Sequence, residues 1–319
     1  MKKLLALVLV AGVLAGLWFV QGWNARGPAR HALTVVVPKG ASLSSAATLL
    51  QKAGAISSRR RFLVQARLFG GEGTIEAGEY EIPAHASNAQ ILNLLEGGKA
   101  LQRMVTIPEG MPSVMVQERL AAAPGLTGEA PLPDEGSVLP NSYSYQRGET
   151  RAAVLKRMQA AMTRTLDALW PKRSPDAVVQ SPEEALTLAS IVEKETAKPS
   201  ERPMIAGVYS NRLKSGMALG ADPTVIYPVT RGKPLGRRIL QSELHAVNGY
   251  NTYTRRGLPV GPIANPGRES ILAVLHPAET QALYFVADGT GGHVFADTMA
   301  EHQANVKKWF DIRRARGEM

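Results

Sequence analysis

The sequence predicts an α+β protein with an N-terminal membrane-spanning helix, a small βααβ module and a larger mixed α+β domain. Three observations carry this prediction. An uncharged apolar run opens the chain, and short β-rich runs then alternate irregularly with stretches of helical periodicity. A length of 319 residues with 45% hydrophobic content allows two folded domains besides an anchor. We expect the segments to be residues 1–30, 31–101 and 102–319.

The first segment has the pattern of a membrane anchor. Leu4–Val20 contains no charged residue and follows Lys2 and Lys3. This length is near the lower limit for crossing a bilayer, and basic residues before a span favour a cytoplasmic N-terminus. A cleaved signal peptide shares the basic start and apolar core, but no good small-x-small site follows the run. We expect a retained single-pass anchor in the cytoplasmic (inner) membrane, with the body of the protein on the periplasmic, extracytoplasmic side.

The second segment shows the order strand, helix, helix, strand. The expected elements are strands at 33–37 and 78–83 and helices at 43–52, 60–69 and, after a cap at Ser87, up to Gly97. This order is that of a LysM-like module, a small glycan-binding domain. An α+β spacer that holds the next domain away from the membrane would show the same pattern.

The third segment opens with a faint repeat of the second. Val105–Gly110 restates Val35–Gly40 as a strand, a proline and a glycine, again followed by a helical pattern. A loop rich in Pro, Gly and acidic residues follows at 123–140, and helical spacing returns from Thr150 to Leu169. Two copies do not make a solenoid, so we interpret them as the opening strands of successive subdomains.

A buried helix from Pro182 to Thr196 is the strongest candidate for carrying chemistry. Ser181 supplies an N-cap and Pro182 the first helical position. Glu193 and Glu195 fall inside its apolar arc, about 160° apart at 100° per residue. A buried carboxyl group has a raised pKa unless a cation or several donors compensate, and a general acid near neutral pH requires such a pKa. A structural ion pair with an arginine or lysine is the alternative for each glutamate.

The stretch from 250 to 267 is dense in Gly and Pro, with interspersed Asn, Thr and Tyr. Such a rigid loop wall with amide and phenol groups suits a neutral polyhydroxylated substrate. Turn chemistry alone would use the same residues.

Other chemistries fit the sequence less well. The net charge of +10 and pI of about 9.9 favour anionic surroundings, yet arginines and aromatics do not interleave as on a nucleic-acid platform. Neither a His-Glu-x-x-His motif nor a Gly-x-Ser-x-Gly elbow occurs, and the chain has no cysteine. Gly289–Gly292 lacks the lysine of a P-loop and fits a hairpin turn better. We expect no metal, no cofactor and no nucleic acid.

Several blocks together resemble a known family. Residues 188–196, Leu-Ala-Ser-Ile-Val-Glu-Lys-Glu-Thr, resemble the signature of the endolytic murein transglycosylases, the MltG or YceG-like family. Further blocks in matching order are Ser200-Glu201-Arg202, Asn211-Arg212-Leu213, Asp222 to Tyr227, Tyr250 to Thr254, Gly257-Leu258-Pro259, Asn265-Pro266-Gly267 and Tyr284 to Gly289 with Gly292-His293. The resemblance runs from about Leu33 to the C-terminus.

The resemblance implies a membrane enzyme with a LysM-like segment and a catalytic domain that cleaves peptidoglycan strands internally. It makes Glu193 the catalytic acid and base, producing a 1,6-anhydroMurNAc end without a second carboxylate. It also implies a role in limiting the length of nascent glycan strands, alongside peptidoglycan synthases. Residues expected to shape the cleft or contact sugar are Ser190, Glu195, Asn211, Arg212, Asp222, Tyr227, Asn251 and Tyr253. We assign Glu195 to an inward network with a cation such as Arg212.

Three positions depart from the family pattern. Gly220-Ala221 stands where a glutamine and a small polar residue are usual, Leu139–Tyr143 replaces a more aromatic and acidic block, and Val260 takes the place of a proline. Three other functions stay open. They are a hydrolytic muramidase, a non-catalytic membrane-tethered glycan-binding scaffold for wall synthesis, and a nucleic-acid binder if the body were cytoplasmic.

Overall fold

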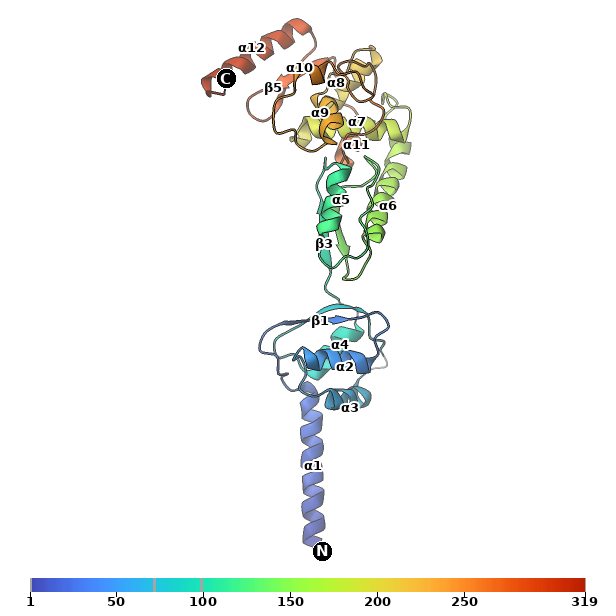
Figure 1. Cartoon of the computed structure of the whole chain (residues 1–319), viewed down its shortest axis with the longest axis vertical. Coiled ribbons are helices and arrows are strands. Elements are labelled where there is room, and N and C mark those ends of the chain that lie inside the picture. Colours follow the sequence, from blue (N-terminus) through green and yellow to red (C-terminus); the bar gives the residue numbers. More distant parts are fainter. Residues whose placement is uncertain (1, 71–72, 98–99, 319) are drawn as a thin grey trace. The chain divides into compact units, whose positions relative to one another are not determined.

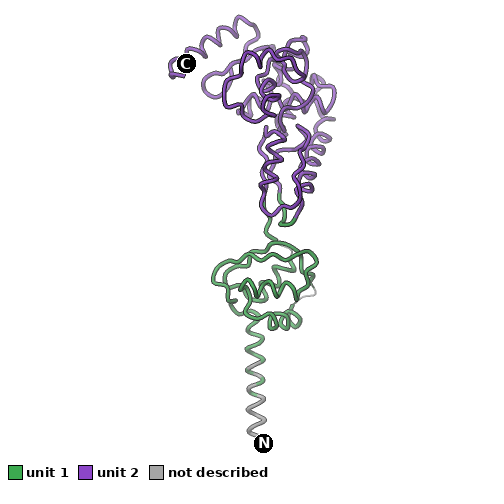
Figure 2. Tube along the Cα trace, in the orientation of Figure 1, with its two compact units in different colours: residues 1–103, 144–148 green, residues 104–143, 149–319 purple. Residues whose placement is uncertain are grey.

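The computed structural model describes residues 2–70, 73–97 and 100–318, without the side chains of 2–9, 11, 13 and 15. The chain forms two compact units (Figure 2). Unit 1 comprises Met1–Arg103 with Ser144–Gly148, and unit 2 comprises Met104–Tyr143 with Glu149–Met319. Both units mix helices and strands, which confirms the predicted α+β class.

Unit 1 has the predicted order of strand, helix, helix, strand (Figure 1). Its elements are α1 Lys2–Asn24, β1 Leu33–Val37, α2 Leu43–Lys52, α3 Arg59–Phe69, β2 Gly78–Ile82 and α4 Asn88–Glu96. The two strands pair antiparallel, with Val35 opposite Tyr80. Serine side chains cap α2, α3 and α4, and Ser87 forms a reciprocal capping box with Gln90.

One hydrophobic core holds unit 1 together. Inward-facing strand residues such as Val35 and Tyr80 pack on Leu50 of α2, Phe62 of α3 and Ile91 of α4. All five are at most 3% exposed. The alternation along the strands and the helical spacing therefore converge on a single apolar centre.

The membrane-spanning segment predicted at Leu4–Val20 falls partly on residues whose side chains lie outside the description. Within the part of the chain that is described, no helix combines the length and the apolar character needed to cross a membrane.

Unit 2 is mainly helical, and its described residues also form two small two-stranded sheets. Its elements are β3 Arg103–Ile107, whose first residue belongs to unit 1, α5 Ser113–Ala122, β4 Asn141–Tyr145, whose last two residues belong to unit 1, α6 Arg151–Leu169, α7 Pro182–Glu195, α8 Arg202–Lys214, α9 Asp222–Thr230, α10 Gln241–Leu244, α11 Arg268–Leu275, β5 Tyr284–Ala287, β6 His293–Ala296 and α12 Met299–Ala315. Strand β3 pairs with β4, and β5 pairs with β6. Short 3₁₀ turns follow α6, at Trp170–Lys172, and precede α8, at Pro199–Glu201.

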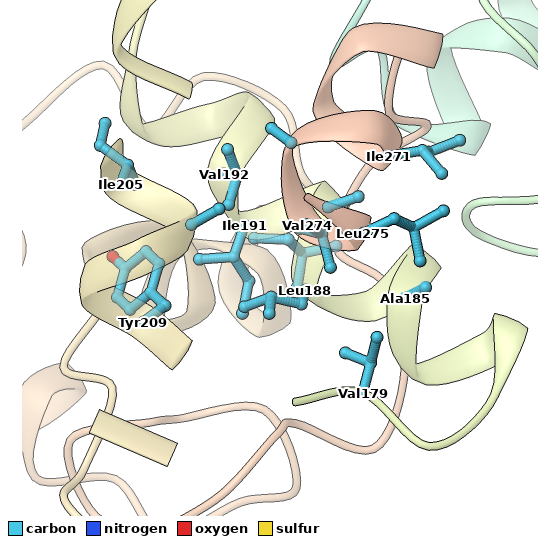
Figure 3. Close-up of a cluster of buried hydrophobic side chains, with 14 of the residues drawn as sticks. Val179, Ala185, Leu188, Ile191, Val192, Ile205, Tyr209, Ile271, Val274 and Leu275 are labelled. Carbon is cyan, nitrogen blue, oxygen red and sulfur yellow. The ribbon is translucent and has the colours of Figure 1, made fainter. Parts of the chain in front are cut away.

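Helix α7 forms the centre of unit 2. Figure 3 shows Leu188, Ile191 and Val192 of α7 packed between α8, which carries Ile205 and Tyr209, and α11, which carries Ile271, Val274 and Leu275. These α7 side chains are fully buried. The helix begins as predicted, because the Ser181 hydroxyl accepts a 3.2 Å hydrogen bond from the Glu184 backbone N–H.

The predictions for the segments after α7 are mostly confirmed. The hairpin around Gly289–Gly292 forms, with β5 and β6 antiparallel and Ala287 opposite His293. Ala221 is the N-cap of α9, and Asp222 with Pro223 occupies its first turn.

Candidate active site

The two glutamates near the end of α7 lie in different surroundings. Glu193 is buried, with 9% of its surface exposed, whereas Glu195 is partly accessible and lines a pocket. Their separation around the helix, predicted from the 100° rule, gives each carboxylate its own set of partners.

Glu193 is fixed by groups from two other segments. Its Oε1 accepts a 2.9 Å bond from Nη2 of Arg202, at the start of α8, and its Oε2 accepts a 2.8 Å bond from the backbone N–H of Gly267. The Arg202 side chain is 8% exposed and also donates to Glu109 at 2.7 Å. Both carboxylate oxygens are therefore held by donors of the protein itself, which suits a structural anchor that joins α7 to α8 and to the loop before α11.

Glu195 has a neutral partner instead. The hydroxyl of Tyr209, a residue of α8, donates a 2.7 Å hydrogen bond to Oε1 of Glu195. Burial raises the pKa of Glu195 to about 7, and the nearby negative charge of Asp222 adds to the rise, while the Tyr209 bond and the positive charge of Arg212 oppose it. A carboxyl group with this pKa exists in both protonation states near neutral pH, as a residue that serves first as acid and then as base requires.

The pocket at Glu195 has a volume of about 360 Å³, within the range of roughly 300–1,000 Å³ usual for small-molecule sites. Five elements and two loops of unit 2 contribute to it. Its lining residues are Glu195, Tyr209, Arg212, Gly220, Asp222, Tyr253, Phe285 and His302. Tyr209 is 1% exposed and Tyr253 46%, so the pocket runs from a buried aromatic wall to an open rim.

The rim carries a second carboxylate. Asp222 is exposed at the start of α9 and accepts a 2.6 Å bond from the Tyr253 hydroxyl. Burial, and then the bond to Asp222, raise the pKa of Tyr253, so this phenol stays protonated. Gly220, one of the departures from the family pattern, lies beside them with φ of +57°.

Arg212 brings positive charge to the pocket but is held by the protein backbone. Its Nε donates to the Leu283 carbonyl oxygen at 2.7 Å and its Nη1 to that of Leu219. The guanidinium also lies over the rings of Tyr209 and Tyr284, at 5.9 and 5.6 Å from their centroids. Arg212 therefore acts on Glu195 through its field, and the predicted network of the two residues takes this indirect form.

Four of the predicted cleft residues have partners that give them structural roles. The Ser190 hydroxyl is buried and accepts from the Ile263 N–H at 3.0 Å. The Asn211 amide donates to the carbonyl oxygens of Thr280 and Ala282.

The other two structural residues are Asn251 and Tyr227. Asn251 is fully buried and its amide nitrogen donates to three backbone carbonyl oxygens, those of Glu243, Leu244 and Ala246. Tyr227 contacts Tyr250, with ring centroids 4.7 Å apart, and donates to Glu135 at 3.2 Å. The pocket thus brings together Glu195, Arg212, Asp222 and Tyr253 of the predicted set, without Ser190, Asn211, Tyr227, Asn251 and Glu193.

Three side chains at the pocket were not predicted from the sequence as site residues. They are Tyr209, Phe285 and His302, from α8, β5 and α12. Burial, and then the charge of Arg212, lower the pKa of His302, which stacks on Tyr284 at 5.2 Å. Tyr209 lies three residues before Arg212 on the same helix, and that spacing was the one available signal, because residues three apart share a helix face.

A model of the YceG-like family matches residues 35–308. A protein of Bacillus subtilis (strain 168) named endolytic murein transglycosylase is 28% identical over 313 residues, covering 88% of this chain and 86% of that protein. A protein of the same name from Streptococcus pneumoniae serotype 2 is also 28% identical, over 86% of this chain, but the match spans only 58% of its length.

A solved structure shows a similar fold. The yceG-like protein of Listeria monocytogenes is 26% identical and superposes with a TM-score of 0.55, covering 86% of this chain and 99% of that one.

Proposed function

Because this chain belongs to the YceG-like family, we propose that it is an endolytic murein transglycosylase whose catalytic acid is Glu195. The relatives' names supply the reaction class, endolytic transglycosylation of murein. The bond that we propose to be cleaved is the MurNAc–GlcNAc bond inside the strand, with formation of a 1,6-anhydro end. The position of Glu195 in a pocket, with a pKa of about 7, is the observation that carries the assignment.

This proposal moves the acid from Glu193 to its neighbour. The role of Glu193 as acid stays a prediction, and its bonds to Arg202 and Gly267 favour a structural role. Both oxygens of Glu193 accept from protein donors. Among the described residues Glu195 accepts one side-chain hydrogen bond, from Tyr209, and its pocket opens toward solvent.

The proposed reaction needs a single group that gives and then takes a proton. Protonated Glu195 donates its proton to the glycosidic oxygen as the bond from that oxygen to C1 of MurNAc breaks. The ionised carboxylate then removes the proton from the MurNAc 6-hydroxyl, and O6 forms a bond to C1. The sugar supplies the nucleophile, so no water is consumed and Glu195 ends in its starting state.

Three neighbours support this cycle. The Tyr209 bond fixes the orientation of the carboxyl group, and the charge of Arg212 stabilises it while ionised. The Tyr253 phenol at the rim offers a donor and an apolar face to a sugar ring.

Hydrolysis is the one competing reaction that a specific observation favours. Asp222 lies in the same pocket as Glu195, and a pair of carboxylates is what a muramidase uses to activate water. The products distinguish the two reactions, because a hydrolysed strand carries a reducing end that contains one more water than the anhydro end.

The test is product analysis by mass spectrometry on purified glycan strands. We expect anhydro ends from the natural protein, loss of product with Glu195→Gln, and retained cleavage per folded molecule with Glu193→Gln. Reducing ends in place of anhydro ends would establish the muramidase. Retained glycan binding without cleavage under all conditions would establish a non-catalytic scaffold, and loss of activity in Glu193→Gln alone would return the acid to Glu193.

The setting of the enzyme forms a second part of the proposal. We propose that Leu4–Val20 anchors the chain in the cytoplasmic membrane and that the body lies outside, as the basic residues Lys2 and Lys3 favour. The strand–helix–helix–strand order of unit 1 supports a LysM-like glycan-binding role. A reporter enzyme that works only outside the cytoplasm should be active when it is fused to the C-terminus. Activity of a C-terminal reporter that works only inside the cytoplasm would refute this placement. Association with wall synthases and control of strand length stay predictions.

A further inference from the structure

A cluster outside the pocket connects the end of α7 to the β5–β6 hairpin. Its central residue is Glu201, in the short turn before α8, whose side chain is 14% exposed. The Oε2 atom accepts from the Thr196 hydroxyl at 3.0 Å and pairs with Nδ1 of His293 at 2.8 Å, and Oε1 accepts from the His293 backbone N–H at 3.0 Å. Thr196 directly follows Glu195, so one carboxylate joins the acid's own backbone to the hairpin.

Charge and donors keep Glu201 ionised in this position. Burial by itself would raise the pKa of Glu201, but the bonds from His293 and Thr196 outweigh it and hold that pKa below its usual value. An ionised carboxylate can only accept, so Nδ1 of His293 carries the hydrogen of their bond. Lys198 adds positive charge at 3.9 Å from both Glu201 and Asp288.

The hairpin is shaped to allow this close approach. Asp288 accepts from the backbone N–H groups of Thr290 and Gly292, at 2.6 and 3.0 Å, which fixes the turn. A Cβ atom at Gly292 would lie 2.3 Å from Oε1 of Glu201 and 2.3 Å from Nζ of Lys198. Glycine at this position is therefore what lets the turn reach Glu201.

Aromatic contacts lead from the hairpin back to the acid. The His293 ring meets Phe285 edge to face, with centroids 5.3 Å apart at 86°. Phe285 meets Tyr209 in the same way, at 5.8 Å and 85°, and Tyr209 donates to Glu195. The contacts thus form a closed ring through Glu195, Thr196, Glu201, His293, Phe285 and Tyr209.

We propose that Glu201 and His293 are positioning residues for Glu195, which hold Phe285 and Tyr209 against it and exclude water from the inner wall of the pocket. The inference rests on the proposed function of Glu195. Neither Glu201 nor His293 lines the pocket, whereas Phe285 and Tyr209 do. The pair acts on the acid only through the ring, and loosening the ring at Glu201, His293 or Phe285 should have the same effect.

That effect is a shift in the pH dependence of catalysis. The groups that face Glu195 are Tyr209 and Arg212 from α8, Asp222 from α9, Tyr253 from its loop and His302 from α12. All of them remain when the ring is loosened, but water reaches the carboxyl group, and the burial that raises the pKa of Glu195 is reduced. The pKa of Glu195 then falls, so its carboxyl group loses the proton at a lower pH.

The experiment measures the pH profile of anhydro-end formation by the full chain. Glu201→Gln, His293→Asn and Phe285→Leu each break the ring; asparagine keeps a donor near the position of Nδ1 but loses the ring that touches Phe285. Each variant should move the alkaline limb down by about one pH unit, so that activity falls roughly tenfold at pH 8 and less than about twofold at pH 5.5. Phe285→Tyr keeps the aromatic ring and should restore the natural limb.

Glu149→Gln is the matched control, since it removes a carboxylate paired with Arg157 that lines no part of the pocket. This variant should leave the alkaline limb of the pH–activity profile unchanged. A uniform loss of activity at all pH values in the ring variants, with no shift, would overturn the proposal and leave a purely structural role.

A second readout covers variants too unstable for kinetics. The pH dependence of the melting temperature between pH 5 and 7 contains a contribution from Glu195, obtained by comparison with Glu195→Gln. Glu201→Gln should shrink that contribution, and an unchanged contribution would count against the ring. If Glu195→Gln itself keeps full activity, the assignment of Glu195 as the acid fails; if it is inactive while the ring variants leave both readouts unchanged, only the positioning role fails.

Discussion

Tyr209 and Glu195 meet across the interface of α7 and α8 through a hydrogen bond of 2.7 Å from phenol to carboxylate. The contact lies at the boundary between the hydrophobic core and the pocket, since Tyr209 is 1% exposed while Glu195 faces the opening. The core that holds α7 against α8 therefore also sets the environment of the proposed acid.

Two neighbours of Glu195 shift its pKa in opposite directions. The Tyr209 bond lowers the pKa and the charge of Asp222 raises it. Tyr209→Phe should move the alkaline limb of the pH–activity profile up, and Asp222→Asn should move it down, each by a fraction of a pH unit to about one unit. Profiles of the rate constant at saturating substrate provide the check. Shifts in the same direction in both variants would contradict the assignment of Glu195.

The raised pKa also makes Glu195 a source of pH-dependent instability. Because the folded-state pKa of about 7 lies above the ordinary 4.5, the folded protein binds more protons than the unfolded chain between these values, and stability falls as pH rises through that window. Glu195→Gln removes this loss and should stabilise the protein at pH 8 by about 3 kcal/mol, at 1.36 kcal/mol per pKa unit. Urea titrations at pH 4.5 and 8 measure it; an equal effect at both values would contradict the linkage.

Glu193 should matter for stability rather than for turnover. Glu193→Gln takes the negative charge from a pair in which Arg202 is 8% exposed, and breaking a buried ion pair costs about 3–5 kcal/mol. Glu109 remains as a partner of Arg202, so we expect a loss nearer to about 3 kcal/mol in the free energy of unfolding. Urea denaturation checks this.

Glu109→Gln is the control for this prediction. The Glu109 side chain is 44% exposed, and its substitution leaves Arg202 paired with Glu193. It should cost less than about 1 kcal/mol. Equal costs for the two variants would mean that Glu193 is not the stabilising partner.

Asn251 and Tyr253 lie two positions apart, but their substitution should affect different properties, stability for Asn251 and substrate binding for Tyr253. Asn251→Ala leaves three backbone carbonyl oxygens without their donor and should lower the free energy of unfolding by about 2–3 kcal/mol. Tyr253→Phe removes only an exposed bond to Asp222 and should leave stability nearly unchanged while raising KM. Melting curves and steady-state kinetics of both variants test the division, and a stable Asn251→Ala with impaired sugar binding would reverse it.

Much of the local structure could be predicted from sequence. The cap at Ser181, the bounds of β1 and α2, and the hairpin of β5 and β6 follow from spacing, capping residues and turn chemistry, all of which act between near neighbours. The pattern of residues 188–196 with its accompanying blocks also indicated the family, which the match over residues 35–308 confirms.

The sequence alone determined that two glutamates lie near the end of one buried helix and point in different directions. Only the tertiary structure decided what each one faces. Arg202 and Gly267 reach Glu193, while Tyr209, Asp222 and Arg212 surround Glu195. A helical wheel gives the direction of a side chain but not its partners, and the partners set whether a buried carboxyl group holds its proton or gives it up.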